Sequence, residues 1–269
     1  MEIYYSTMIF LFGLLLGSFY NVVGYRIPNN MSIVKPGSFC PKCRHELKWY
    51  ELIPVFSFLF QGGKCKKCKC RISFFYPVIE LLTGILFLIS YLVFGFSPEF
   101  IFAILTASFL VIVIVSDFNY LVISDEVTIF FSISSIVLQF ILLGCERGVS
   151  AIIYGFFLFF LMYLIMLFGS KLMKEEALGG GDVKIMFFIG TILSVSNPIV
   201  FYDFSSYGVL INTFFEIFLA SCFATPFALL NFFSKKERVV PFGPFLLAAA
   251  LVMCLTSFDV LDFLLNYKI

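Results

Sequence analysis

The chain has 269 residues, of which 61% are hydrophobic and only 13% are charged. Soluble domains carry about 25% charged residues, so this composition excludes an ordinary soluble protein and favours one that lies in a lipid bilayer. The formal net charge of +1 gives no reason to expect a nucleic-acid partner.

Eight apolar stretches approach the length of about 20 residues that a transmembrane helix needs. In chain order they are residues 8–26, 77–95, 99–116, 127–144, 149–170, 183–200, 209–233 and 242–266. The first stretch lacks a basic start and a small-residue cleavage site, so we expect an uncleaved helix rather than a signal peptide. The sequence therefore predicts an all-α polytopic membrane protein with about eight transmembrane helices.

Basic residues concentrate in alternate connections between these stretches. They are abundant in 27–75 and recur in 171–184 and 234–240, whereas the other connections hold Arg147 alone. Because cytoplasmic loops are enriched in Lys and Arg, we expect the basic connections inside the cell and both termini outside. The predicted division of the chain is a first helix (1–27), a cytoplasmic loop domain (28–75) and a transmembrane domain (76–269).

Two Cys-x-x-Cys pairs lie in the loop domain between the first and second predicted helices. They are Cys40 with Cys43, and Cys65 with Cys68. Two such pairs supply the four thiolates of a closed tetrahedral zinc site, so we expect a structural rather than a catalytic ion. A dithiol or disulfide role is the weaker alternative, because the cytoplasm disfavours disulfides. Cys70 is a spare, although its spacing also lets it replace Cys68.

Acidic residues in or beside membrane helices are costly and therefore suggest function. Those without an evident solvated position are Glu80, Asp117, Asp125, Glu126, Asp182 and Glu216. The predicted third helix ends at Asp117 and the sixth begins at Asp182, so the topology brings both to the cytoplasmic face. Two adjacent carboxyl groups can share a proton and act on a water as base and acid. Spacing alone does not separate Asp117 from Asp125 as the first member of this pair.

Three glycines, Gly179, Gly180 and Gly181, precede Asp182 directly. Without Cβ atoms they allow another chain to approach closely, so an extended peptide substrate could bond to their backbone. The alternative is that they only separate two helices.

These residues together resemble the prepilin peptidases, also called type IV leader peptidases. This family consists of aspartyl proteases whose bacterial members often also methylate the new N-terminus. The motifs that carry the resemblance run in order along nearly the whole chain, at residues 17–28, 40–54, 62–68, 76–80, 117–125, 179–184 and 241–245. The ordered set is specific, whereas each motif alone would be weak.

The resemblance implies that Asp117 and Asp182 are the catalytic aspartates, with Gly179–Gly181 and Lys184 in the supporting motif. Asp125 stands where the family has an acidic residue after a proline. Because Ser124 replaces that proline here, we expect Asp125 to be the N-cap of the next helix.

Substrates and cofactors also follow from the resemblance. It implies prepilins or pseudopilins of type IV pili or type II secretion, cleaved after a glycine at the cytoplasmic face of the bacterial cytoplasmic membrane. It implies S-adenosylmethionine as the methyl donor, since the zinc-loop form of the family is the one associated with methylation. The residues predicted near that donor, from their proximity to the cysteine pairs, are Gly62, Gly63, Glu51 and Glu80.

Two other functions fit parts of the sequence. A proton- or cation-coupled transporter would also place carboxylates in membrane helices, but the chain has no half-chain symmetry. A non-catalytic scaffold that docks a partner through its zinc loop is the third hypothesis, and the intact aspartate pair argues against it.

Overall fold

The structure is a computed structural model that describes residues 1–173, 178–196, 206–235 and 240–256. Within these ranges the chain forms helices and loops, with two isolated β-bridges and no β-strand. The long helices are α1 (Glu2–Arg26), α3 (Phe75–Phe94), α4 (Pro98–Tyr120), α5 (Asp125–Leu142), α6 (Cys145–Met173), α7 (Gly180–Ser196), α8 (Ser206–Lys235) and α9 (Gly243–Thr256).

Each predicted apolar stretch corresponds to one of these helices, which confirms an all-α membrane architecture. Six of the described helices, α1, α3, α4, α5, α6 and α8, are long and apolar enough to cross a bilayer. Helix α9 is a shorter apolar helix. The predicted helix ends between 197 and 200 and between 257 and 266 lie outside the described residues, as do Lys174, Lys236 and Arg238 of the basic connections.

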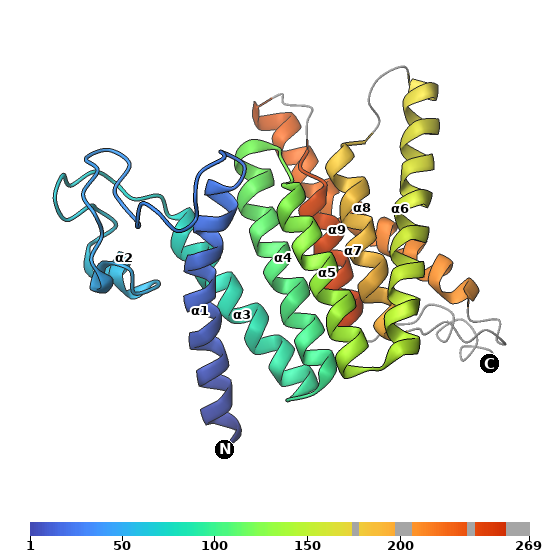
Figure 1. Ribbon diagram of the computed structural model, residues 1–269. Helices are drawn as coiled ribbons and strands as arrows, with labels where there is room; N and C mark the ends of the chain where they lie inside the picture. The colour runs from blue at the N-terminus through green and yellow to red at the C-terminus, as the bar shows by residue number, and fades with distance from the viewer. Residues whose placement is uncertain (174–177, 197–205, 236–239, 257–269) are drawn as a thin grey trace.

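Helix α4 lies at the centre of the bundle. Buried side chains make up 72% of its apolar window, against 22% for α8 and 39% for α1. It packs against α1, α3, α5 and α9 (Figure 1). A helix that is apolar on every side is suited to such a position, because neighbouring helices rather than water surround it.

Glycines allow α1 to lie directly against its neighbours. A Cβ added at Gly13 would come within 2.7 Å of the Gly84 Cα in α3, and one added at Gly17 would come within 2.8 Å of the Glu80 Cα. At Gly24 an added Cβ would collide with Val115 of α4. Small residues at membrane helix contacts let backbones approach and gain van der Waals packing.

A buried polar network joins α5 to α7. The Gln139 amide nitrogen donates to the Thr191 carbonyl at 2.6 Å, and the Ser194 hydroxyl donates to the Gln139 amide oxygen at 2.9 Å. Arg147 is the single basic residue in the connections predicted to lie outside the cell, and it donates to the Val195 carbonyl at the end of α7. Polar side chains that find partners across a helix contact help to hold membrane helices together.

The helices alternate in direction, which gathers several helix ends at one end of the bundle. There α1 ends at Arg26, α4 ends at Tyr120, and α5, α7 and α9 begin at Asp125, Gly180 and Gly243 (Figure 1, upper end). We call this the upper end. The loop between α1 and α3 also leaves from it and contains the short helices η1 (Trp49–Glu51) and α2 (Phe56–Phe60).

Candidate functional site

Asp117 lies in the last turn of α4, on the part of the helix that is enclosed by its neighbours. Its side chain is buried, with 5% of the residue exposed. The helix ends just beyond it, where Leu121 adopts a left-handed conformation and its N–H donates to the Asp117 carbonyl at 2.9 Å. A buried carboxyl group is therefore placed at the boundary of a central membrane helix.

Asp182 lies in the first turn of α7 and is also buried, with 8% of the residue exposed. Its backbone N–H donates to the Gly179 carbonyl at 3.1 Å. One side-chain oxygen lies 3.3 Å from the position that a Cβ of Gly243 in α9 would occupy. A Cβ at Gly179 would lie equally close to the other oxygen. A larger residue at Gly179 or at Gly243 would therefore crowd the Asp182 carboxyl group.

The end of α4, with Asp117, and the start of α7, with Asp182, lie at the same end of the bundle (Figure 1), although 65 positions separate the two residues in the chain. The two carboxyl groups lie close enough for the charge of Asp117 to act on Asp182. Ile123, in the connection that follows α4, fixes this arrangement from the side. Its methyl group would lie 2.9 Å from a Cβ of Gly181 and 2.8 Å from one of Gly243.

The three glycines before Asp182 have different surroundings. Gly181 is closely packed against Ile123, and a Cβ at Gly179 would lie 3.3 Å from the Asp182 carboxylate. Gly180 has open space where a side chain would be. The segment thus combines tight packing on one side with a backbone that another chain can approach.

Asp125 is not the N-cap of α5, which corrects the prediction. Ser124 is the N-cap residue and Asp125 is the first residue of the helix. Its carboxylate accepts hydrogen bonds from the Lys184 ammonium at 2.6 and 2.8 Å, across to α7. Both side chains are about half exposed, at 57% and 47%. The ion pair takes the place of a cap interaction, because a cation from a neighbouring helix competes well for an acidic side chain in a first turn.

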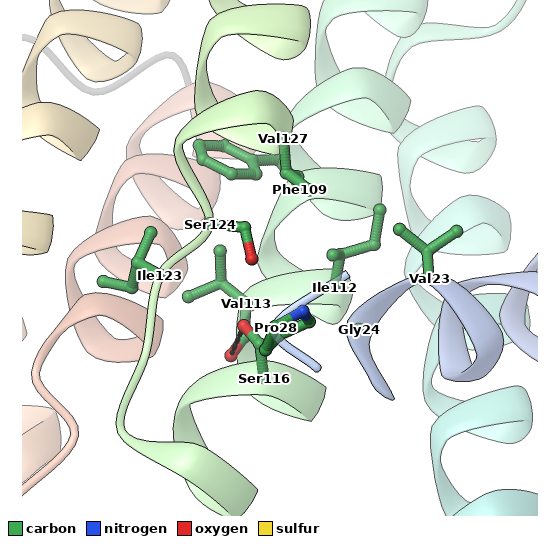
Figure 2. Close-up of a pocket in the computed structure, with 10 residues that line it drawn as sticks. All are labelled: Val23, Gly24, Pro28, Phe109, Ile112, Val113, Ser116, Ile123, Ser124 and Val127. Atoms are coloured by element: carbon green, nitrogen blue, oxygen red, sulfur yellow. Dashed lines mark hydrogen bonds between the residues drawn. The ribbon is translucent and has the colours of Figure 1, made fainter. Parts of the chain in front are cut away.

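A small apolar hollow lies between the end of α1, α4 and the start of α5. Figure 2 shows its lining, in which Ser116 and Ser124 are the residues with polar side chains among hydrophobic neighbours. The full lining is Val23, Gly24, Pro28, Phe109, Ile112, Val113, Ser116, Ile123, Ser124 and Val127. Neither Asp117 nor Asp182 is among its lining residues.

Glu216 is a further buried carboxyl group, to which the predicted helix directions gave no position at the site. It lies in α8 with no exposed surface, and neither of its oxygens has a hydrogen-bond partner among the described residues. Glu80, also buried, has a partner, since it accepts a hydrogen bond from the Val55 N–H at 2.7 Å. That bond ties the loop to the start of α3.

The four predicted metal ligands converge in the loop. The sulfur atoms of Cys40, Cys43, Cys65 and Cys68 all lie within 4.8 Å of one another. The Cys40–Cys68 and Cys43–Cys65 distances are both 3.9 Å. Tetrahedral zinc with Zn–S bonds of about 2.3 Å requires sulfur atoms about 3.8 Å apart. The cluster therefore has the dimensions of a four-thiolate metal site.

Each cysteine pair sits in a small hairpin of the same construction. The Cys40 N–H donates to the His45 carbonyl at 2.9 Å, and the Cys65 N–H donates to the Cys70 carbonyl at 2.8 Å. Arg44 and Lys69, at equivalent positions, both adopt left-handed conformations, with φ values of 55° and 59°. Backbone N–H groups that face the sulfurs favour the thiolate, and the Cys43 N–H lowers the pKa of Cys40 to about 6.

Arg26 anchors the start of the loop, and sequence reasoning gave it no separate role. It is buried at the end of α1, and its guanidinium donates to the carbonyls of Ser32, Pro36 and Gly37 at 2.8 to 3.0 Å. An arginine directly after an apolar stretch resembles a snorkelling side chain in sequence, so nothing in the pattern distinguished the two roles.

The residues predicted near a methyl donor have structural partners in the loop. Glu51 is buried, and the Lys48 N–H together with His45 holds the pKa of its carboxyl group below the ordinary value. Its other oxygen has no partner among the described residues. Gly62 and Gly63 form a turn with φ values of 60° and 66°, and open space surrounds the position of a Gly62 side chain. The described contacts of Gly62, Gly63, Glu51 and Glu80 form no cradle for a molecule of that size.

Comparison with known proteins gives a consistent result over most of the chain. Residues 11–94 match the bacterial peptidase A24 N-terminal domain, which takes in α1, the loop and α3, and residues 104–229 match the type IV leader peptidase family. No solved structure shows significant similarity.

Curated relatives include several proteins named prepilin leader peptidase/N-methyltransferase. The protein of that name from Bacillus subtilis (strain 168) is 35% identical, over 96% of both chains. The one from Vibrio cholerae is 31% identical, over 80% of this chain and 88% of the relative. The one from Myxococcus xanthus is 37% identical, over 71% of this chain and 56% of the relative.

Proposed function

Because this chain belongs to the type IV leader peptidase family, we propose that Asp117 and Asp182 are the catalytic pair with which it processes prepilin-like leader peptides. The family and its named relatives support both a peptidase and an N-methyltransferase activity, and they do not support a transporter. The observation that carries the proposal is that two buried carboxyl groups, from α4 and α7, lie at the same end of the bundle, where the charge of one acts on the other.

The pair acts on a water molecule between the two carboxyl groups. The ionised carboxyl takes a proton from the water as it attacks the scissile carbonyl, while the protonated one donates to the carbonyl oxygen. The resulting tetrahedral intermediate collapses when the leaving amine receives a proton. Burial suits this chemistry, because two carboxyl groups in a poorly solvated site share one proton rather than both ionising.

The substrate lies with its apolar segment in the bilayer and its leader at the upper end. Cleavage after a glycine lets the peptide lie close to the open backbone at Gly180. The basic residues of the 27–75 loop favour the cytoplasm for this end, in the inner membrane of a bacterium.

The metal of the loop is zinc, held by Cys40, Cys43, Cys65 and Cys68. Sulfur spacings of 3.9 Å support this assignment, because they are close to the tetrahedral edge of about 3.8 Å that zinc thiolates require. Four thiolates leave no open position, so the ion supplies folding stability to a loop that is too small for a hydrophobic core.

The methyl donor is S-adenosylmethionine, which supplies an electrophilic methyl group to the new terminal amine. Within the loop, Glu51 has a buried carboxyl oxygen without a hydrogen-bond partner, which is left to accept a hydrogen bond from S-adenosylmethionine. Since the loop residues form no cradle, we assign no further contact to the donor.

We retain the division into a first helix (1–27), a metal loop (28–75) and a peptidase domain (76–269) as part of the proposal.

The decisive experiment is a cleavage assay on a prepilin substrate with the purified protein in lipid or detergent, followed by mass analysis of the product N-terminus. The parent protein should remove the leader and, with S-adenosylmethionine present, add one methyl group. Asp117→Ala and Asp182→Ala should insert normally and cleave nothing. Cleavage by either variant would remove that residue from the mechanism, and an unmethylated product would restrict the function to proteolysis.

A further inference from the structure

The two hairpins of the metal loop are equivalent in backbone but differ in the residue at their sixth position. In the first hairpin, Cys40 pairs with His45, and in the second, Cys65 pairs with Cys70. An isolated bridge flanks each pair, Phe39 with Glu46 and Lys64 with Arg71. His45 and Cys70 therefore occupy the same place in two copies of one structural unit.

The side chains at this shared place point to different partners. The His45 ring nitrogen lies 3.3 Å from the Glu51 carboxylate. The Cys70 sulfur lies 3.6 Å from the Cys40 sulfur and 3.2 Å from the Cys68 sulfur. A fifth thiol thus lies within the group of sulfurs that forms the metal site, whereas the equivalent histidine lies outside it, within hydrogen-bonding distance of Glu51.

We propose that Cys70 is an alternative metal ligand that exchanges with Cys68, so that Cys40, Cys43 and Cys65 hold the ion together with either of the two. This inference rests on the proposed metal site. It concerns which thiols of this chain bind the ion, and it does not depend on the peptidase reaction.

The sulfur distances favour exchange over a five-sulfur site. The Cys40–Cys70 distance of 3.6 Å is close to the tetrahedral edge of about 3.8 Å, so Cys70 can occupy a corner. The Cys68–Cys70 distance of 3.2 Å is too short for both to be corners of one tetrahedron. Zinc imposes no geometry through its d electrons, so a change of one thiolate for another leaves the site equivalent.

Burial of the two competing residues also differs. Cys68 is exposed and Cys70 is partly buried, as is Cys43, whereas Cys40 and Cys65 are buried.

The exchange breaks one metal–sulfur bond and forms another. The entering thiol of Cys70 releases a proton and the departing thiolate of Cys68 takes one up, so no oxidant or reductant is required.

Thiol labelling of the metal-loaded parent protein tests the exchange directly. The purified protein is treated briefly with N-ethylmaleimide, denatured and cleaved after glutamate, because cuts at Glu51 and Glu80 leave Cys65, Cys68 and Cys70 on one peptide. Fragment masses then locate the label. We expect one label per loop, divided between Cys68 and Cys70, with Cys65 protected. Label confined to Cys70, with Cys68 protected, would overturn the proposal.

The metal content of four variants provides a second readout. Cys68→Ser and Cys70→Ser should each retain about one zinc ion per chain, whereas Cys68→Ser/Cys70→Ser and the control Cys65→Ser should lose it. Loss of zinc in Cys68→Ser as complete as in Cys65→Ser would show that Cys70 cannot substitute. Retention by the double variant would show that neither residue is needed. A parent protein without metal would instead refute the zinc site itself, and the inference with it.

Discussion

The site in the helix bundle and the site in the metal loop are built in opposite ways. Asp117 and Asp182 come from helices far apart in the chain and meet because the helices alternate in direction. The four cysteines lie within 29 consecutive positions, on two hairpins of identical backbone pattern. The first site depends on the packing of the whole bundle, whereas the second depends on local turns and on an ion.

This difference determines what a mutation does in each place. Large apolar contacts around α4 hold the carboxyl groups in position, so a neutral replacement of one carboxyl should leave the bundle folded and remove only its chemistry. In the loop, a ligand is part of the structure itself, because metal binding supplies the stability that a small polar segment lacks. The predictions below test this contrast, from the largest expected effect to the smallest.

The largest effect is expected from replacing either carboxyl group of the pair with a neutral amide. Asp117→Asn and Asp182→Asn each keep the side-chain shape but can no longer exchange a proton, so cleavage should fall by about 10³-fold or more. The measurement is the rate of leader removal in detergent. Asp125→Asn is the matched control, since Asp125 is exposed at the same end of the bundle. If Asp125→Asn were inactive and Asp117→Asn active, the catalytic role would belong to Asp125.

Removal of the metal should disrupt the loop and spare the bundle. After chelation, or in Cys65→Ser, trypsin should cut rapidly among Lys64, Lys66 and Lys67, while helical circular dichroism stays within a few per cent of the parent. Peptide mapping over time gives the cutting rate. Cys145→Ser, an exposed cysteine outside the loop, should resist trypsin as the parent does. A collapse of helical signal on chelation would mean that the loop also supports the bundle.

An intermediate effect is expected where α1 touches α3. Gly17→Ala places a methyl group 2.8 Å from the Glu80 Cα, a backbone atom that cannot move aside, so we expect a destabilisation of about 1–3 kcal/mol. Thermal unfolding in detergent would report it as a lower midpoint. Gly37→Ala is the control, because open space surrounds an added methyl group there. Equal midpoints for the two variants would show that α1 and α3 separate easily.

The smallest effect is expected from the ion pair between Asp125 and Lys184. Both side chains are about half exposed, and such pairs contribute about 0.2–1 kcal/mol. A double-mutant cycle with Asp125→Asn and Lys184→Met should give a coupling energy in that range, and it should decline as salt is added. A coupling several times larger would indicate that the pair is shielded from solvent in the working protein.

Much of this architecture could be predicted because its signals are local. The cysteine pairs identify a metal loop by spacing, and runs of apolar residues identify the helices. Where both fall within the described residues, the helix ends lie within four residues of the predicted ones, except that α1 begins six residues before its predicted stretch. The assigned helix directions place Asp117, Asp125 and Asp182 at one end of the bundle, and the resemblance to the family is what singles out Asp117 and Asp182. The prediction that Asp125 is a cap was wrong because its partner, Lys184, comes from a different helix.

Contacts between side chains of different helices could not be predicted in the same way. The bond from Gln139 to the Thr191 carbonyl depends on which faces of α5 and α7 meet, although a glutamine within an apolar stretch signals a buried partner. The carbonyl cage around Arg26 depends on the path of the loop after α1. Glu216 was recognised as unusual from sequence, and its complete burial sharpens that observation.

The glycine contact between α1 and α3 fixes the two points at which the metal loop leaves the bundle and returns to it. Because those two helices touch backbone to backbone through Gly13 and Gly17, the entry and exit of the loop stay paired whatever lies between them. The described contacts that join the central part of the loop to the start of α3 include the Glu80–Val55 hydrogen bond and the edge-to-face contact of the Phe58 and Phe74 rings. The loop can therefore vary in length and sequence without altering the α1–α3 contact from which it leaves and to which it returns.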